Sequence, residues 1–166
     1  LARLRGASKV IITQRSRYRL DLASERFPID RTIVSVEEDL RDAVMEETDG
    51  LGADVIFVCA ASREAQETAL SLLASRGRVN FFGGLPADDH VVRLDANALH
   101  YNEYFIAGAS SSLPGTNHEA LRLLAERKID PDLLITHRFP LGEIHAAFDV
   151  AESKRCIKVV VEPGSC

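Results

Sequence analysis

The sequence is poor in the features that mark secreted, membrane and nucleic-acid-binding proteins. Its three cysteines, Cys59, Cys156 and Cys166, are odd in number and widely spaced, which argues against a disulfide framework and for a reducing, cytoplasmic environment. No apolar run approaches the length of a membrane span, and residues 1–5 lack the apolar core of a secretory signal. The formal net charge is −5 and no block of lysines and arginines occurs, so we expect neither nucleic acid nor a membrane as a partner.

Metal-binding and nucleophilic motifs are also missing. The five histidines share no ligand spacing with one another or with the cysteines, and neither a Cys-x-x-Cys nor a His-Glu-x-x-His motif occurs. Ser62 and the serines at 110–112 have no evident base beside them. The sequence therefore indicates no metal site and no hydrolase triad in this chain.

An alternation of apolar strands and amphipathic helices is what the sequence does contain. Residues 55–59 are a short, β-branched apolar run, typical of a strand that is buried on both faces. Residues 78–82 predict a second strand. Between the two, residues 63–76 predict a helix that is capped by Ser62 and ended by Gly77 as a left-handed residue.

The carboxyl ends of these two strands are predicted to meet. In a right-handed parallel crossover both ends lie at the edge of the sheet where ligands bind. This predicts that Cys59 and Ala60 lie beside Gly83 and Gly84. The glycines would let a ligand approach the backbone, although an isolated Gly-Gly pair is also an ordinary turn, and Cys59 is equally explained as a small buried hydrophobe.

The same alternation continues along the rest of the chain. Residues 1–5 predict the end of a helix that Gly6 stops, and Thr116 or Asn117 caps a helix that runs to residue 125. Further strands are predicted at residues 9–13, 32–34, 103–109, 133–137 and 156–161, and further helices at residues 20–27, 37–47, 95–101 and 141–151. This order implies an α/β fold with a doubly wound, mainly parallel sheet.

Residues 14–17 point to a nucleotide. In dinucleotide-binding folds an acid at the end of the second strand binds the ribose of NAD, whereas an arginine nearby accepts the 2′-phosphate of NADP. Here Gln14 ends the strand and Arg15 and Arg17 follow, which favours NADP over NAD. Two solvated arginines in a surface turn would explain the same pattern. Lys158, in the last predicted strand, would reach a pyrophosphate or face solvent from an edge strand.

Together these segments resemble the C-terminal half of the zinc-dependent medium-chain dehydrogenases/reductases, the sorbitol (L-iditol) dehydrogenase group in particular. The resemblance is carried by KVIIT (9–13), RLDLA (19–23), GADVI (52–56), GRVNFFG (77–83), LHYNE (99–103), LITHRFPL (134–141), AF (147–148) and KVV (158–160), in this order and spacing. It implies a Rossmann-like fold and an NAD(P)-dependent oxidoreductase. Such an enzyme exchanges hydride between a small secondary alcohol, often a polyol, and the matching ketone, with a catalytic zinc.

The resemblance also implies roles by position. Residues 1–132 would be a truncated NAD(P)-binding domain and residues 133–166 part of the substrate domain, and the molecule would be a homo-oligomer. The implied cofactor contacts are Gln14, Arg15 and Arg17 at the adenosine end, Cys59, Ala60, Gly83 and Gly84 along the nicotinamide–ribose path, Ala109 and Ser110 near the carboxamide, and Lys158 near the pyrophosphate.

The sequence departs from this family at its beginning. The Gly-x-Gly-x-x-Gly turn, the strand before it and the zinc-binding catalytic domain do not occur. We therefore expect a fragment that is inactive by itself, with zinc bound only in the full-length parent. The place of the missing central strand would be filled by strands that close up or by a second chain. The alternative is a non-enzymatic α/β nucleotide-fold module that acts only through association.

Overall fold

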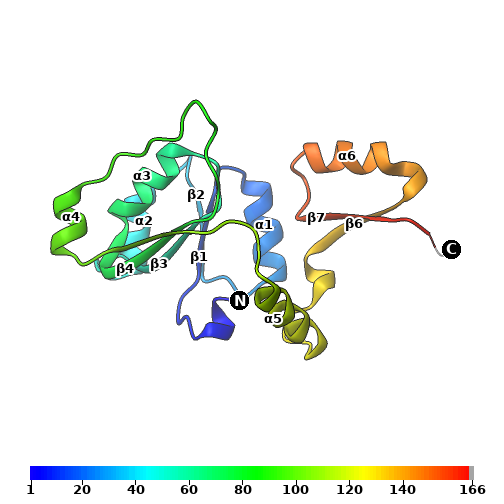
Figure 1. Cartoon of the computed structure of the whole chain (residues 1–166), viewed down its shortest axis with the longest axis horizontal. Coiled ribbons are helices and arrows are strands. Elements are labelled where there is room, and N and C mark those ends of the chain that lie inside the picture. Colours follow the sequence, from blue (N-terminus) through cyan, green and yellow to red (C-terminus); the bar gives the residue numbers. More distant parts are fainter. Residues whose placement is uncertain (165–166) are drawn as a thin grey trace. The chain divides into compact units, whose positions relative to one another are not determined.

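Parallel strands joined by helices make up the computed structural model, which describes residues 1–164 (Figure 1). Its chain divides into two units, one combining Leu1–Glu38 with the chain from Leu113 onward and the other spanning Asp39–Ser112. Cys166, which was counted among the cysteines above, lies outside the described residues. Across residues 1–164, no helix combines the length and the apolar character that crossing a membrane would need.

The second unit is built on a parallel sheet of three strands in the order β3-β4-β5. Its elements in chain order are α2 (Leu40–Glu47), β3 (Ala53–Val58), α3 (Arg63–Ser71), β4 (Leu73–Phe81), α4 (Ala96–Tyr101) and β5 (Phe105–Gly108). Each strand is joined to the next by a helix, as the sequence predicts. Ser62 caps α3 by accepting a hydrogen bond from the Ala65 amide at 3.2 Å, which confirms the predicted cap.

One face of this sheet packs against α3, as Figure 1 shows. The buried cluster consists of Val58, Ala69, Leu73 and Val79. The expectation that β3 is buried on both faces is wrong. Because successive side chains of a strand point to opposite faces, Val55 and Phe57 lie on the other face, and they are 54% and 66% exposed.

The end of α3 also differs from the prediction. The helix stops at Ser71 rather than at residue 76, and Leu72, which follows it, is right-handed, so no left-handed residue ends the helix; the left-handed Arg76 (φ 63°) lies within β4. Gly77 also lies within β4, where there is no room for a side chain. A Cβ at this position would lie 2.7 Å from the carbonyl oxygen of Ala74 and 3.1 Å from that of Ala53. The glycine is therefore required by the close approach of two backbone segments.

The first unit holds two separate parallel pairs of strands. Its elements are η1 (Arg3–Arg5), β1 (Ile11–Gln14), α1 (Arg17–Arg26), β2 (Arg31–Val34), α5 (Pro114–Ala125), η2 (Pro131–Leu133), β6 (Ile135–Pro140), η3 (Leu141–Glu143), α6 (Ile144–Glu152) and β7 (Lys158–Glu162). β1 pairs with β2, and β6 pairs with β7. The α/β class and the mainly parallel pairing are confirmed.

Three details of the prediction need correction. The 3₁₀ turn η1 is short, although Gly6 (φ 91°) ends it as expected. α5 begins at Pro114, ahead of both predicted caps, because proline suits the first helical position, where its missing N–H costs nothing. In the described part of the chain the hydrogen-bonded strands form three separate sheets. How the place of the missing strand is filled, by strands that close up or by a second chain, stays a prediction.

Replacing Gly77 by alanine should destabilise the protein, because its Cβ would overlap the Ala74 carbonyl. We expect the free energy of unfolding, measured by urea denaturation, to fall by about 1–3 kcal/mol, as overpacking usually costs. Gly84→Ala is the matched control, since nothing lies within 4 Å of the added carbon. Equal effects of the two substitutions would contradict the packing argument.

Candidate functional site

The second unit brings six of the predicted site residues to the carboxyl end of its sheet. Each of the three parallel strands is followed by one pair of them. The pairs are Cys59 and Ala60 after β3, Gly83 and Gly84 after β4, and Ala109 and Ser110 after β5. Because neighbouring parallel strands end at the same edge, the three pairs share one edge of the sheet, here called the strand-end edge.

Backbone contacts at the strand-end edge are close. The amide of Gly83 donates a hydrogen bond to the carbonyl of Val58 at 2.9 Å. A Cβ on Gly83 would lie 2.6 Å from the carbonyl oxygen of Ala60 and 2.8 Å from that of Cys59. The predicted adjacency of these segments is confirmed, and a side chain at Gly83 is excluded by the backbone it faces.

Gln66, on α3, supports the strand-end edge through a hydrogen bond. It was not among the predicted site residues. Its side chain is buried, and its Nε2 donates a hydrogen bond to the carbonyl of Gly83 at 3.0 Å. The sequence does contain a pattern that predicts a buried role for Gln66. Gln66 precedes Ala69 by one helical turn, so a polar side chain lies on the apolar face of the helix and needs a buried partner.

The chemistry that the strand-end edge offers is that of binding. Its side chains are small and exposed, and the Cys59 thiol is exposed rather than buried, which corrects the alternative that it is a core residue. In β4, the Oδ1 atom of Asn80 is buried without a hydrogen-bond partner among the described residues. The exposed backbone groups and the Ser110 hydroxyl suit a flat polar ligand that lies along the strand ends, whereas the Asn80 acceptor is buried beneath them.

The arginines predicted to bind a phosphate lie in the first unit, after β1. Gln14 folds its side chain over the turn, since its Oε1 accepts a hydrogen bond from the Arg15 amide at 2.9 Å. Arg17 pairs with Glu37, with 3.3 Å between its Nε and Oε1 of Glu37. This hydrogen bond raises the pKa of Arg17 above its ordinary value. Arg17 is therefore already engaged with a carboxylate.

Arg15 differs from Arg17 in having an unengaged charge. Its side chain is exposed, and its guanidinium has no hydrogen bond or ion pair within the residues that the structure covers. Lys158, the first residue of β7, is exposed as well, and its carbonyl accepts a hydrogen bond from the Thr136 hydroxyl at 3.1 Å. Of the two predicted arginines, Arg15 is the one that can receive an anion without breaking an existing pair.

A metal site is not formed by the described side chains. Between residues 1 and 164, no three or more His, Cys, Asp or Glu side chains come together to hold a metal ion. The described residues therefore do not offer the set of ligands that a zinc ion needs.

Comparison with known proteins places these features in a family. A profile of the zinc-binding dehydrogenase family matches residues 1–126. The chain belongs to the zinc-binding dehydrogenase family. The resemblance derived from the sequence motifs is confirmed at this level.

Two relatives show how much of a family member the chain represents. It is 31% identical over 156 residues to a sorbitol dehydrogenase of Halalkalibacterium halodurans, covering 93% of this chain and 45% of the relative. It is 32% identical over 166 residues to an L-threonine 3-dehydrogenase of Bacillus licheniformis, covering 98% of this chain and 46% of the relative. The chain thus spans about half the length of the curated relatives it matches.

A solved structure matches the backbone over nearly the whole chain. A zinc-binding dehydrogenase structure from Sinorhizobium meliloti 1021, solved with NADP bound, is 28% identical to this chain with a TM-score of 0.85. The match covers 98% of this chain and 47% of that one. The arrangement of strands and helices described above is therefore that of the family.

Substituting Gln66 by leucine should weaken the strand-end edge, because the Gly83 carbonyl would lose its donor from α3. We expect the free energy of unfolding to fall by about 1–3 kcal/mol, with faster amide hydrogen exchange at Gly83. Glu64→Gln on the exposed side of α3 is the control and should change stability by less than about 0.5 kcal/mol. Unchanged exchange at Gly83 in the leucine variant would refute the supporting role.

Proposed function

We propose that this chain supplies the cofactor-binding part of a zinc-dependent, NAD(P)-linked dehydrogenase that acts on a small secondary alcohol, such as a polyol, or on its ketone. The observation that carries the proposal is the strand-end edge. There the backbone of Gly83 approaches that of Ala60 so closely that no side chain fits between the strand ends. Ligands of open parallel sheets bind at this edge, and the edge lies inside the segment matched by the family profile.

The residues of the edge then have distinct tasks. Cys59, Ala60, Gly83 and Gly84 form a surface without bulky side chains, along which the nicotinamide and its ribose lie. Ala109 and Ser110 face the carboxamide, to which backbone amides and the Ser110 hydroxyl donate. When bound, the nicotinamide supplies the group that accepts or gives hydride. The protein's contribution at this edge is orientation, which the Gln66 hydrogen bond to Gly83 makes rigid.

The groups that perform the chemical step are not assigned to this chain. Among residues 1–164 no group of three or more His, Cys, Asp or Glu side chains is placed to hold a metal ion, and the chain covers 45% of the related sorbitol dehydrogenase. We expect cofactor binding without turnover from this chain by itself. Residues 1–132 would serve the cofactor domain and residues 133–166 the substrate domain, in a cytoplasmic homo-oligomer.

A preference for NADP over NAD follows from the residues after β1. Gln14 places no acid there to accept the ribose hydroxyls of NAD, and the unengaged guanidinium of Arg15 attracts a phosphate. A charge-assisted hydrogen bond contributes about 1.5–3 kcal/mol. One such bond therefore corresponds to roughly tenfold or more in affinity between the two cofactors.

Calorimetric titration of the protein with NADPH and with NADH tests the proposal. We expect NADPH to bind in the micromolar range, and Arg15→Glu to weaken it by about tenfold or more while leaving NADH binding unchanged. Arg127→Glu makes the same charge change at an exposed arginine elsewhere in the unit and should have little effect. If neither cofactor binds, the cofactor role is wrong and a module that acts through association is favoured.

The Arg17–Glu37 pair predicts a gain of function. Glu37→Gln removes a carboxylate and releases the Arg17 guanidinium, so NADPH should bind several-fold more tightly while NADH binding stays constant. The pair is exposed, and such pairs contribute about 0–1 kcal/mol to folding, so the urea midpoint should barely move. Weaker NADPH binding by the glutamine variant would show that Arg17 does not face the phosphate.

A further inference from the structure

The turn between α6 and β7 lies against the start of α1, within the first unit. The Nε of Arg19 donates a hydrogen bond to the carbonyl of Lys154 at 3.0 Å, although the two residues are 135 positions apart in the sequence. The guanidinium of Arg155 lies over the ring of Tyr18, 5.2 Å from its centroid. Cations from the C-terminal segment are thereby held beside the residues that follow β1.

The conformation of this turn is fixed by its own contacts. Lys154 adopts a left-handed backbone (φ 59°) directly after the last turn of α6. The amide of Arg155 donates to the Ser153 hydroxyl at 3.2 Å, and the next residue, Cys156, is buried. Because both neighbours are anchored, the Arg155 side chain leaves the turn in a defined direction, towards Tyr18.

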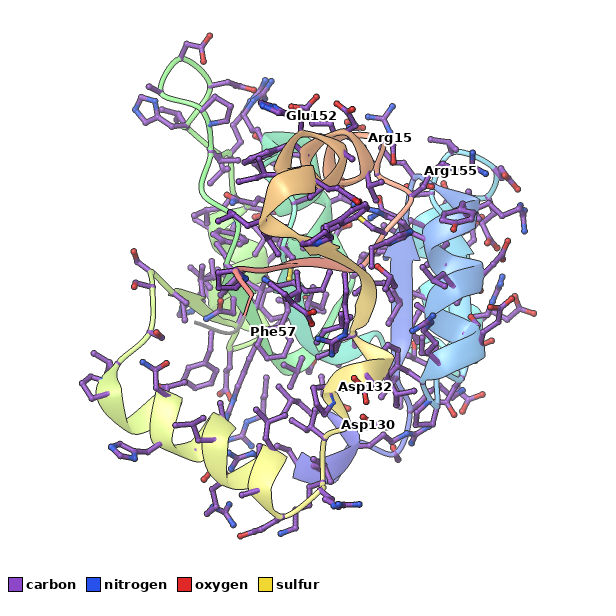
Figure 2. The ribbon with its side chains drawn as sticks, turned by 90° about the vertical axis from the view of Figure 1, so that its right-hand side faces the viewer. Arg15, Phe57, Asp130, Asp132, Glu152 and Arg155 are labelled. Atoms are coloured by element: carbon purple, nitrogen blue, oxygen red, sulfur yellow. The ribbon has the colours of Figure 1, made fainter. Side chains whose placement is uncertain are left out.

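The basic residues around this turn are named here the adenosine-end cluster. They are Arg19 and Arg155, which make the two contacts just described, with Lys154 in the turn and Arg15 two positions before α1. In the view of Figure 2, Arg15, Arg155 and Glu152 lie towards the same end of the first unit. In the described part of the chain no ion pair joins Arg15 or Arg155 to a carboxylate. Unpaired like charges repel, and an anion bound among them would remove that repulsion.

We propose that Arg155 binds the 2′-phosphate of NADP together with Arg15, so that the turn after α6 carries a determinant of cofactor specificity. This inference rests on the proposed function and deepens it. A guanidinium that lies over an aromatic ring keeps the N–H groups at its rim free, and these match phosphate oxygens in a forked geometry. Tyr18 therefore positions Arg155, and Arg15, in the turn after β1, supplies the second cation.

Two small probes test the inference on the full chain. Adenosine 2′,5′-bisphosphate and 5′-AMP differ only in the 2′-phosphate, and their affinities are measured by calorimetry. We expect Arg155→Gln to weaken the bisphosphate by about tenfold while 5′-AMP binding stays within about twofold. Arg155→Lys retains the charge but lacks the fork, so its affinity should be intermediate. Tyr18→Leu should weaken the bisphosphate several-fold through the loss of positioning, with an unchanged urea midpoint as the check on folding.

The outcomes separate this inference from the proposed function. Tighter binding of the bisphosphate than of 5′-AMP, unaffected by Arg155→Gln, would overturn the role of Arg155 and leave the cofactor role standing. Equal weakening of both probes by that substitution would also overturn the assignment, because it would show general attraction of anions. Binding of neither probe by the unaltered chain would overturn the inference and the proposed function together.

Discussion

The contact on which the second unit depends is the approach of the Gly83 backbone to Ala60 at the strand-end edge. The Gly83 amide is bonded to Val58, and its carbonyl is bonded to Gln66, so both backbone groups of this residue are satisfied from within the unit. A glycine is required because the space for a Cβ is taken by a carbonyl oxygen at 2.6 Å. The same constraint that packs the strand ends together excludes a side chain at Gly83, and a ligand that lies across strand ends needs a surface without bulky side chains.

Those features of the site that follow from parallel topology could be predicted from the sequence. Once residues 55–59 and 78–82 are identified as strands of one crossover, Cys59 and Gly83 must end at the same edge, and they do. The burial of β3 could not be predicted in this way. An unbroken apolar run fits a strand covered on both faces, but which faces are covered depends on elements far away in sequence, and Phe57 is exposed.

Side-chain partners were the other failure of sequence reasoning, for a physical reason. Arg17 has the right type and position for a phosphate, but its guanidinium is hydrogen-bonded to Glu37, which lies in the segment after β2. Gln66 was missed because helical periodicity counts apolar positions, and a buried polar residue registers only as an interruption. Gly77 was assigned to a helix end by its residue type, whereas its location in β4 reflects the space between two backbones. Each error concerns a contact between segments, which local patterns do not encode.

Competition between carboxylates and phosphate for the same guanidinium groups decides what the adenosine-end cluster can bind. An exposed ion pair such as Arg17–Glu37 contributes about 0–1 kcal/mol, whereas a hydrogen bond from a guanidinium to a phosphate contributes about 1.5–3 kcal/mol. A phosphate therefore binds the Arg17 guanidinium more strongly than a carboxylate does. However, a phosphate bound there is also repelled by the negative charge of Glu37. Arg15 and Arg155 impose no such cost, because neither has a carboxylate partner in the residues described. Because of this difference, Arg15 and Arg155 should contribute more to phosphate binding than Arg17 does. Specificity for the cofactor thus depends on a few exposed charges, which can change without any change in the fold.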